Sequence, residues 1–183
     1  MDRPQLIAAG KVALLLAIGV VLQVLVVSQI RVLGVTADLF LILTLVVAIG
    51  RGPLWGCVFG FFVGLCADVA FFQPLGMHAL IYLLTGYCVG LVVSRLVMVT
   101  PWMVFLIAGV SSFASQFVFG LFQYIMGPHG AFLVVVANQM LPEMVLDALI
   151  TVPIFLLVLR LRIIRGPAAP LSPTSSPTRT EAG

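Results

Sequence analysis

Long apolar runs separated by short polar breaks are the feature that most constrains this chain. They occupy most of its 183 residues, and hydrophobic side chains make up 62% of the sequence against 8% for charged ones. A soluble core cannot hide that much apolar surface, whereas a membrane span needs roughly 20 apolar residues to cross about 30 Å of hydrocarbon. The pattern predicts an all-α integral membrane protein with about six transmembrane helices in one bundle.

The breaks between the runs set the expected boundaries. Arg51-Gly52-Pro53, residues 73–76 and Thr100-Pro101 carry turn-forming residues, so neighbouring spans should form antiparallel hairpins. The second run is short, so it either begins earlier or lies inside the bundle, where lipid thickness matters less. We expect an N-terminal segment at residues 1–11, a transmembrane domain at 12–165, a disordered Pro- and Ser-rich tail at 166–183, and spans at about 12–30, 37–50, 54–72, 76–97, 102–126 and 141–161.

Basic residues predict the orientation of these spans. With six spans and the N-terminus inside, the outer side holds only Arg31. The inner side holds the other eight basic residues: Arg3, Lys11, Arg51, Arg95, Arg160, Arg162, Arg165 and Arg179. Because cytoplasmic loops of membrane proteins are enriched in Lys and Arg, both termini are expected in the cytoplasm.

The ionisable residues of the membrane part cluster at the opposite side under the same topology. Asp38, Asp68, His78, Glu143 and Asp147 all fall in its outer half. Glu143 and Asp147 share a helical face, and Asp147 lies roughly 9 Å into its span. One interpretation is an outward-opening polar cleft that binds a ligand or a partner's basic or hydroxyl group. The other is that Asp38 and Asp68 are helix-end residues in interfacial water, with Arg31 as a counter-ion; Asp147 is harder to hydrate.

A glycine repeat marks the third span. Gly52, Gly56, Gly60 and Gly64 are each four residues apart, so one helical face carries no side chain and lets another helix approach closely. A second ladder of small residues, which includes Ala9 and Ala13, runs into the first span. Each face is either packed inside the bundle or forms an interface with a partner helix.

Catalytic, cofactor and metal motifs do not appear in the sequence. It has no phosphate-binding glycine loop and no HExxH or GxSxG pattern, and its three cysteines lie in apolar runs without CxxC spacing. The Ser111-Ser112 pair and Ser115 have no spacing relative to a histidine that indicates a nucleophile and a base. The basic residues are scattered rather than gathered on one face, which argues against nucleic-acid binding. We therefore expect no enzyme activity, no cofactor and no metal.

Several ordered motifs resemble the rod shape-determining protein MreD family. They are residues 37–43 (ADLFLIL), 51–56 (RGPLWG), 64–68 (GLCAD) and 74–80 (PLGMHAL), in this order and spacing. In the last span the family usually has Leu-Pro, then Asn five positions after the proline, then a second proline. This chain has Leu141-Pro142 and Pro153 at the matching positions, but Asp147 replaces the Asn. The likeness covers the chain from the first span to Arg165.

The resemblance implies a non-catalytic subunit of the bacterial cell-elongation complex in the inner membrane. Members of the family associate with MreC, a bitopic protein with a large extracytoplasmic part. Through MreC they associate with the MreB filament, the RodA glycosyltransferase and its penicillin-binding transpeptidase. The implied role is control of lateral peptidoglycan synthesis and cell shape.

A rival hypothesis comes from the family's similarity in fold to the substrate-binding subunits of energy-coupling-factor vitamin transporters. In the first hypothesis, the Gly52 to Gly64 face or the Ala9 ladder receives the transmembrane helix of an MreC-like partner. In the second, the outer cleft binds a small nutrient, while Ala9 and Ala13 contact an energy-coupling subunit. The ordered motifs favour the first hypothesis.

Overall fold

The fold described here comes from a computed structural model, which describes residues 10, 14, 17–23, 25, 35–96, 98–126 and 136–160. No β-strand occurs in these ranges, which confirms the all-α prediction. Residues 17–23 are helical, and the later elements follow in the order α2 (Leu39–Arg51), α3 (Pro53–Ala70), α4 (Met77–Ser94), α5 (Pro101–Met126), the π-helix η2 (Val136–Met140) and α7 (Leu141–Arg160).

Helices α3, α4, α5 and α7 are each long and apolar enough to cross a membrane. Their outward surfaces are rich in exposed Leu, Val and Phe, as expected for side chains that face lipid. The chain is therefore a membrane protein. Helix α2 has only 13 residues, and much of the expected first span lies outside the described residues, so the count of six spans stays a prediction.

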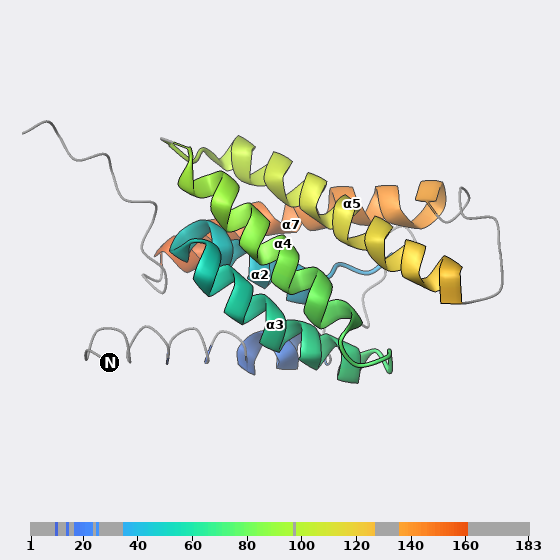
Figure 1. Cartoon of the computed structure of the whole chain (residues 1–183). Helices are drawn as coiled ribbons and strands as arrows, with labels where there is room; N and C mark the ends of the chain where they lie inside the picture. The colour runs from blue at the N-terminus through green and yellow to red at the C-terminus, as the bar shows by residue number, and fades with distance from the viewer. Residues whose placement is uncertain are drawn as a thin grey trace, which may run out of the picture.

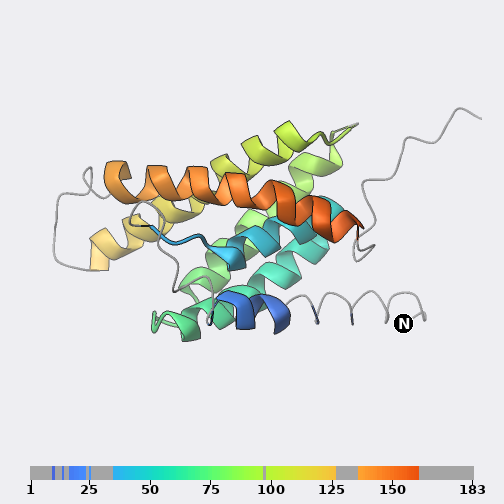
Figure 2. The same cartoon turned by 180° about the vertical axis from the view of Figure 1, so that it is seen from behind.

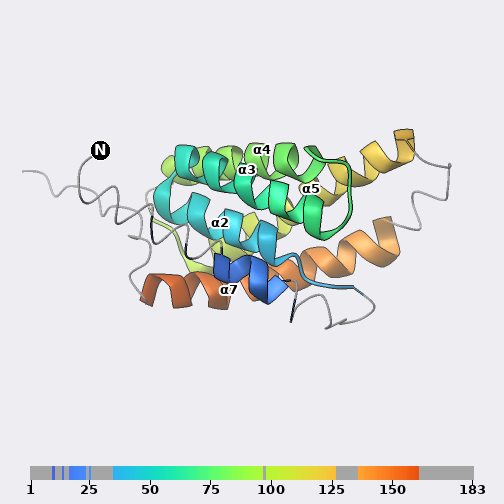
Figure 3. The same cartoon turned by 90° about the horizontal axis from the view of Figure 1, so that it is seen from below.

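Helix α2 lies inside the bundle, which is one of the two alternatives that its short sequence left open. Figure 3 shows it between the α3–α4 pair and α7, and the helical segment 17–23 lies beside it. Eleven of its residues, from Leu39 to Ile49, are buried. Seen from behind, α7 runs across the bundle in front of α2 (Figure 2). A 13-residue helix rises only about 20 Å, so this element depends on protein neighbours rather than on spanning lipid.

Local sequence explains where the helices begin and end. The carboxylate of Asp38 accepts the backbone N–H of Leu41 at 3.1 Å and caps the start of α2. Gly52 ends α2 with a φ of 90°, a left-handed value that favours glycine, and Pro53 then occupies the first turn of α3. Gly76, with a φ of 104°, precedes α4 in the same way. These Gly and Pro positions make the tight antiparallel turns of the bundle.

The glycine repeat of α3 packs against helices of the same chain. A Cβ at Gly56 would lie 2.6 Å from both the Ala48 Cβ and the Gly86 carbonyl oxygen, and one at Gly64 would lie 2.6 Å from the His78 carbonyl oxygen. Residues of α2 and α4 therefore occupy the space that side chains would need. Gly52 differs, because nothing lies within 4 Å of its Cβ position, and it serves the turn instead. Ala9 and Ala13 lie outside the described residues.

The two ends of the bundle differ in charge. Helices α2, α4 and α7 begin at one end, where α3 and α5 finish, on the right-hand side of Figure 1. Asp38, Asp68, His78 and Glu143 lie at this end, which we call the acidic end. Arg51, Arg95 and Arg160 follow or close α2, α4 and α7 at the other end, which we call the basic end.

Candidate functional site

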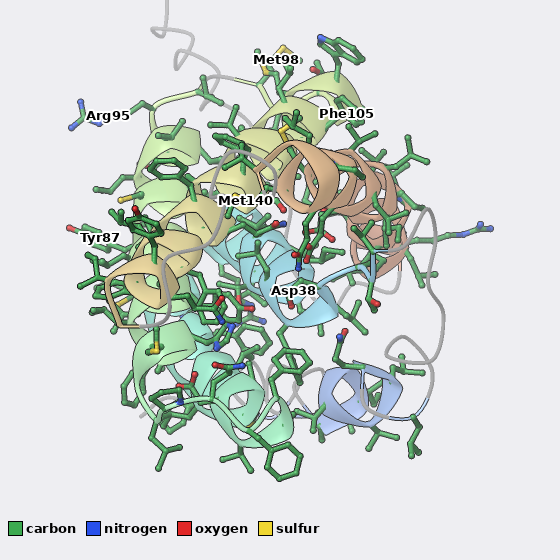
Figure 4. All side chains as sticks on the ribbon, turned by 90° about the vertical axis from the view of Figure 1, so that its right-hand side faces the viewer. Asp38, Tyr87, Arg95, Met98, Phe105 and Met140 are labelled. Atoms are coloured by element: carbon green, nitrogen blue, oxygen red, sulfur yellow. The ribbon has the colours of Figure 1, made fainter. Side chains whose placement is uncertain are left out.

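The ionisable residues singled out from the sequence come together at the acidic end, in two hydrogen-bonded groups beside one cavity. Asp38 and Asp147 belong to the first group, and Asp68 and His78 to the second. Glu143 lines the cavity together with Asp38 and His78. Figure 4 looks onto this end and shows Asp38 near the centre, at the start of α2.

Asp147 connects three helices. Its side chain is 0% exposed, and its Oδ1 accepts the backbone N–H of Asp38 at 2.9 Å. Its Oδ2 accepts the hydroxyl of Ser112, on α5, at 2.6 Å. Both carboxylate oxygens are therefore satisfied by protein donors, which removes much of the cost of placing this group inside a membrane bundle. A carboxylate at this depth fastens α7 to α2 and α5.

Hydrogen bonds of Asp38 and Gln23 also hold the first residues of α2 in place. The hydroxyl of Tyr82, on α4, donates to Oδ2 of Asp38, while Oδ1 caps the helix. Oε1 of Gln23 accepts the backbone N–H of Leu39 at 2.9 Å, and its Nε2 donates to the carbonyl oxygen of Ala37 at 3.4 Å. The first backbone N–H groups of a helix have no intrahelical acceptor, so these side chains satisfy groups that lipid cannot.

Asp68 organises the turn between α3 and α4 and is only 1% exposed. Its Oδ2 accepts the backbone N–H of Gly76 at 2.7 Å, and its Oδ1 accepts the backbone N–H of His78 at 2.9 Å. Nδ1 of His78 lies 2.8 Å from the same Oδ1. Because a carboxylate accepts, this geometry assigns the ring proton to Nδ1. The side chain thus caps α4 from the preceding helix.

A cavity of about 640 Å³ lies between these two groups. Its polar lining includes Asp38, His78 and Glu143, and its apolar lining includes Phe71 and Phe119. The Phe119 ring lies against His78 with a centroid separation of 4.5 Å, and the Phe71 ring lies at 5.9 Å. Met140, labelled in Figure 4, lines the cavity just before α7. The cavity therefore has an aromatic wall as well as polar groups.

Sequence reasoning missed several polar residues of this end. Tyr82, Gln23 and Gln116 were not singled out, and Ser112 was considered only as a nucleophile. Here the Ser112 hydroxyl donates to Asp147 and accepts from Nε2 of Gln116 at 3.1 Å. The available signal was their rarity, since polar side chains within long apolar runs need partners.

Ser115, another of the three serines considered on this helix, pairs with a neighbouring helix. Its hydroxyl lies 2.9 Å from that of Thr85, on α4. Within the described ranges, no three His, Cys, Asp or Glu side chains are grouped as a metal site requires. The hydrogen bonds that these serines make serve helix packing.

The family to which the chain belongs follows from a comparison with protein-family models. The model for rod shape-determining protein MreD matches residues 6–162, which include every described helix. The chain belongs to the MreD family. Searches of curated proteins and of solved structures gave no match. The similarity in fold to energy-coupling-factor subunits therefore stays a prediction.

Membership of the MreD family confirms the resemblance drawn from residues 37–80 and Leu141 to Pro153. It identifies the chain as a rod shape-determining membrane protein, a class named for its role in cell shape. Among the ordered motifs, Asp38 and Asp68 each cap a helix, and Gly64 lets α3 approach α4. Two motif residues thus hold the acidic end together, and the third packs the helices beneath it.

Proposed function

We propose that this MreD-family chain is a non-catalytic subunit of the cell-elongation complex, which binds an MreC-like bitopic protein in the bacterial inner membrane. The family match over residues 6–162 carries this proposal. Through that partner the subunit acts with the MreB filament, a RodA-type glycosyltransferase and a penicillin-binding transpeptidase. Its role is to help control lateral peptidoglycan synthesis, and the same match favours it over nutrient transport.

The packing of the bundle limits the surfaces that are available to a partner helix. Gly56, Gly60 and Gly64 already contact α2 and α4, so the α3 glycine face serves the interior of the subunit. A partner helix then uses either the first-span ladder with Ala9 and Ala13 or one of the lipid-facing surfaces of the outer helices. Those surfaces are apolar on α4, α5 and α7, where Leu84, Val110 and Leu149 are exposed.

The orientation is part of the proposal. Arg51, Arg95 and Arg160 share the basic end of the bundle, and cytoplasmic ends of membrane helices are enriched in arginine and lysine. We place that end, and both termini, in the cytoplasm. The acidic end with its cavity then faces the side on which the MreC-like partner has its large domain and on which peptidoglycan is made.

Depletion of the chain in its own rod-shaped host tests the role in wall synthesis. Cells should become round, and pulse-labelling with a fluorescent D-amino acid should lose its lateral pattern while septal labelling persists. Re-expression of the intact chain should restore both readouts. Rod shape and lateral labelling that persist after depletion would contradict the role.

A further inference from the structure

Glutamine side chains dominate the polar lining of the cavity at the acidic end. Five of the seven glutamines in the sequence line it. Gln23 and Gln116 make the hydrogen bonds described above, whereas Gln73, Gln123 and Gln139 have no hydrogen-bond partner within the described part of the chain. An amide both donates and accepts, and therefore matches hydroxyl groups, which do the same.

The charges on the cavity wall disfavour an anion. Its described lining includes the carboxylates of Asp38 and Glu143 but no Lys or Arg. Both oxygens of Asp38 already accept hydrogen bonds, from Leu41 and Tyr82. Only Glu143 has a carboxylate without a partner among the described residues, against three free amides. The absence of Lys and Arg from the described lining disfavours a phosphate, and the three free amides favour a neutral group with many hydroxyls.

The aromatic side chains of the cavity wall offer an apolar surface to a ligand, in addition to the polar amides. The rings of Phe71 and Phe119 both lie near the ring of His78, and Nδ1 of His78 is hydrogen-bonded to Asp68. With the proton on Nδ1, the other ring nitrogen can accept a hydroxyl proton. A sugar ring has apolar C–H faces and a polar hydroxyl edge, so it can lie against the phenyl rings while its hydroxyls meet the amides.

We propose that this cavity is a binding site for a neutral, hydroxyl-rich group of the sugar class. About 640 Å³ is within the usual range for small-molecule pockets, and it corresponds to roughly twenty waters at about 30 Å³ each. The α5 face that lines it, residues 115, 116, 119, 120 and 123, follows a helical period, so the amides and Phe119 stand on one continuous wall.

The same chemistry can arrive as a free sugar or as the sugar headgroup of a lipid. Two probes distinguish these sources: tritiated methyl β-D-glucoside, and tritiated octyl β-D-glucoside below its micelle concentration. The full chain is placed in phosphatidylcholine nanodiscs without any partner. Specific binding is the count displaced by excess unlabelled probe, after subtraction of empty nanodiscs.

Two variants and one control connect the binding to this cavity. Gly120→Phe puts a ring on the lining face of α5 and should reduce binding at least tenfold. Gln123→Leu removes one free amide and should reduce it several-fold. Ser94→Leu makes a comparable polar-to-apolar change at the exposed basic end and should leave binding unchanged. If Gly120→Phe fails to fold, the Gln123→Leu result decides.

Each outcome bears on the proposal. Binding of both glucosides supports recognition of the sugar alone, and binding of the octyl glucoside alone supports a sugar carried on a lipid. Binding of neither probe overturns the proposal. Equal displacement by 1-octanol or octyl phosphate, or retention of full binding in Gln123→Leu, overturns it too. Because no partner is present, failure here leaves the proposed role in the elongation complex intact.

Discussion

The backbone N–H of Asp38 donates a hydrogen bond to the carboxylate of Asp147, at 2.9 Å and across 109 residues of sequence. This bond joins the start of the central helix α2 to α7. A second bond from Ser112 holds the same carboxylate against α5. Three helices therefore depend on one buried side chain at the acidic end.

Replacing Asp147 by Leu should destabilise the bundle by about 2–4 kcal/mol, because the Asp38 N–H and the Ser112 hydroxyl lose their acceptors in a buried site. Asp147→Asn should cost much less, since the amide oxygen can still accept from Asp38 while its nitrogen donates to Ser112. The midpoint of unfolding in a detergent and SDS mixture measures both. Equal midpoints for the Leu variant and wild type would contradict the connecting role.

Replacing Gly60 by Leu should also be costly. A Cβ at this position would lie 2.7 Å from the Tyr82 carbonyl carbon and 3.0 Å from Cγ2 of Thr44, so α3 must move away from α4 and α2. Overpacking of this kind costs about 1–3 kcal/mol or more. Gly10→Leu is the matched control, since nothing lies within 4 Å of its Cβ position. The same unfolding assay should separate the two, and two equal midpoints would refute the close contact.

The cap that Asp68 provides should control opening of the turn before α4. Asp68→Asn replaces one acceptor oxygen with a donor, so either the Gly76 or the His78 backbone N–H loses its partner. Hydrogen exchange in peptides covering residues 72–82 should become about tenfold faster or more. His78→Phe removes only the ring contact and should have a smaller effect. Unchanged exchange in Asp68→Asn would argue against the cap.

The proposed orientation of the bundle predicts which loops are accessible from outside the cell. After the native cysteines Cys57, Cys66 and Cys88 are changed to alanine, Leu75→Cys samples the exposed turn between α3 and α4. It should react with a membrane-impermeant maleimide in intact spheroplasts. Ser94→Cys, at the basic end, should react only after permeabilisation. The reverse pattern would invert the topology.

Several parts of this fold could be predicted from the sequence because they depend on local chemistry. Gly52-Pro53 and Gly76 mark turns since only certain backbone angles fit there, and long apolar runs mark helices regardless of their neighbours. Placement of Asp38 and Asp68 at one end followed from the alternation of antiparallel spans.

Pairings between distant helices could not be read in the same way. No local pattern indicates that Asp147 accepts the N–H of Asp38 or that Tyr82 donates to Asp38, because these contacts depend on how helices pack in three dimensions. The glycine repeat of α3 indicated close packing, but its period alone does not say whether the neighbour belongs to the same chain. The contacts of Gly56 and Gly64 with α2 and α4 answer that question.

The most direct test of the proposed function is co-purification from membranes of the native host. The intact chain, tagged at its C-terminus, is extracted in mild detergent, and the proteins recovered with it are identified by mass spectrometry beside an untagged control. We predict enrichment of an MreC-like bitopic protein, reduced in Gly60→Leu. Recovery of an energy-coupling ATPase subunit instead, or of no MreC-like protein at any detergent strength that keeps the chain folded, would contradict the proposed function.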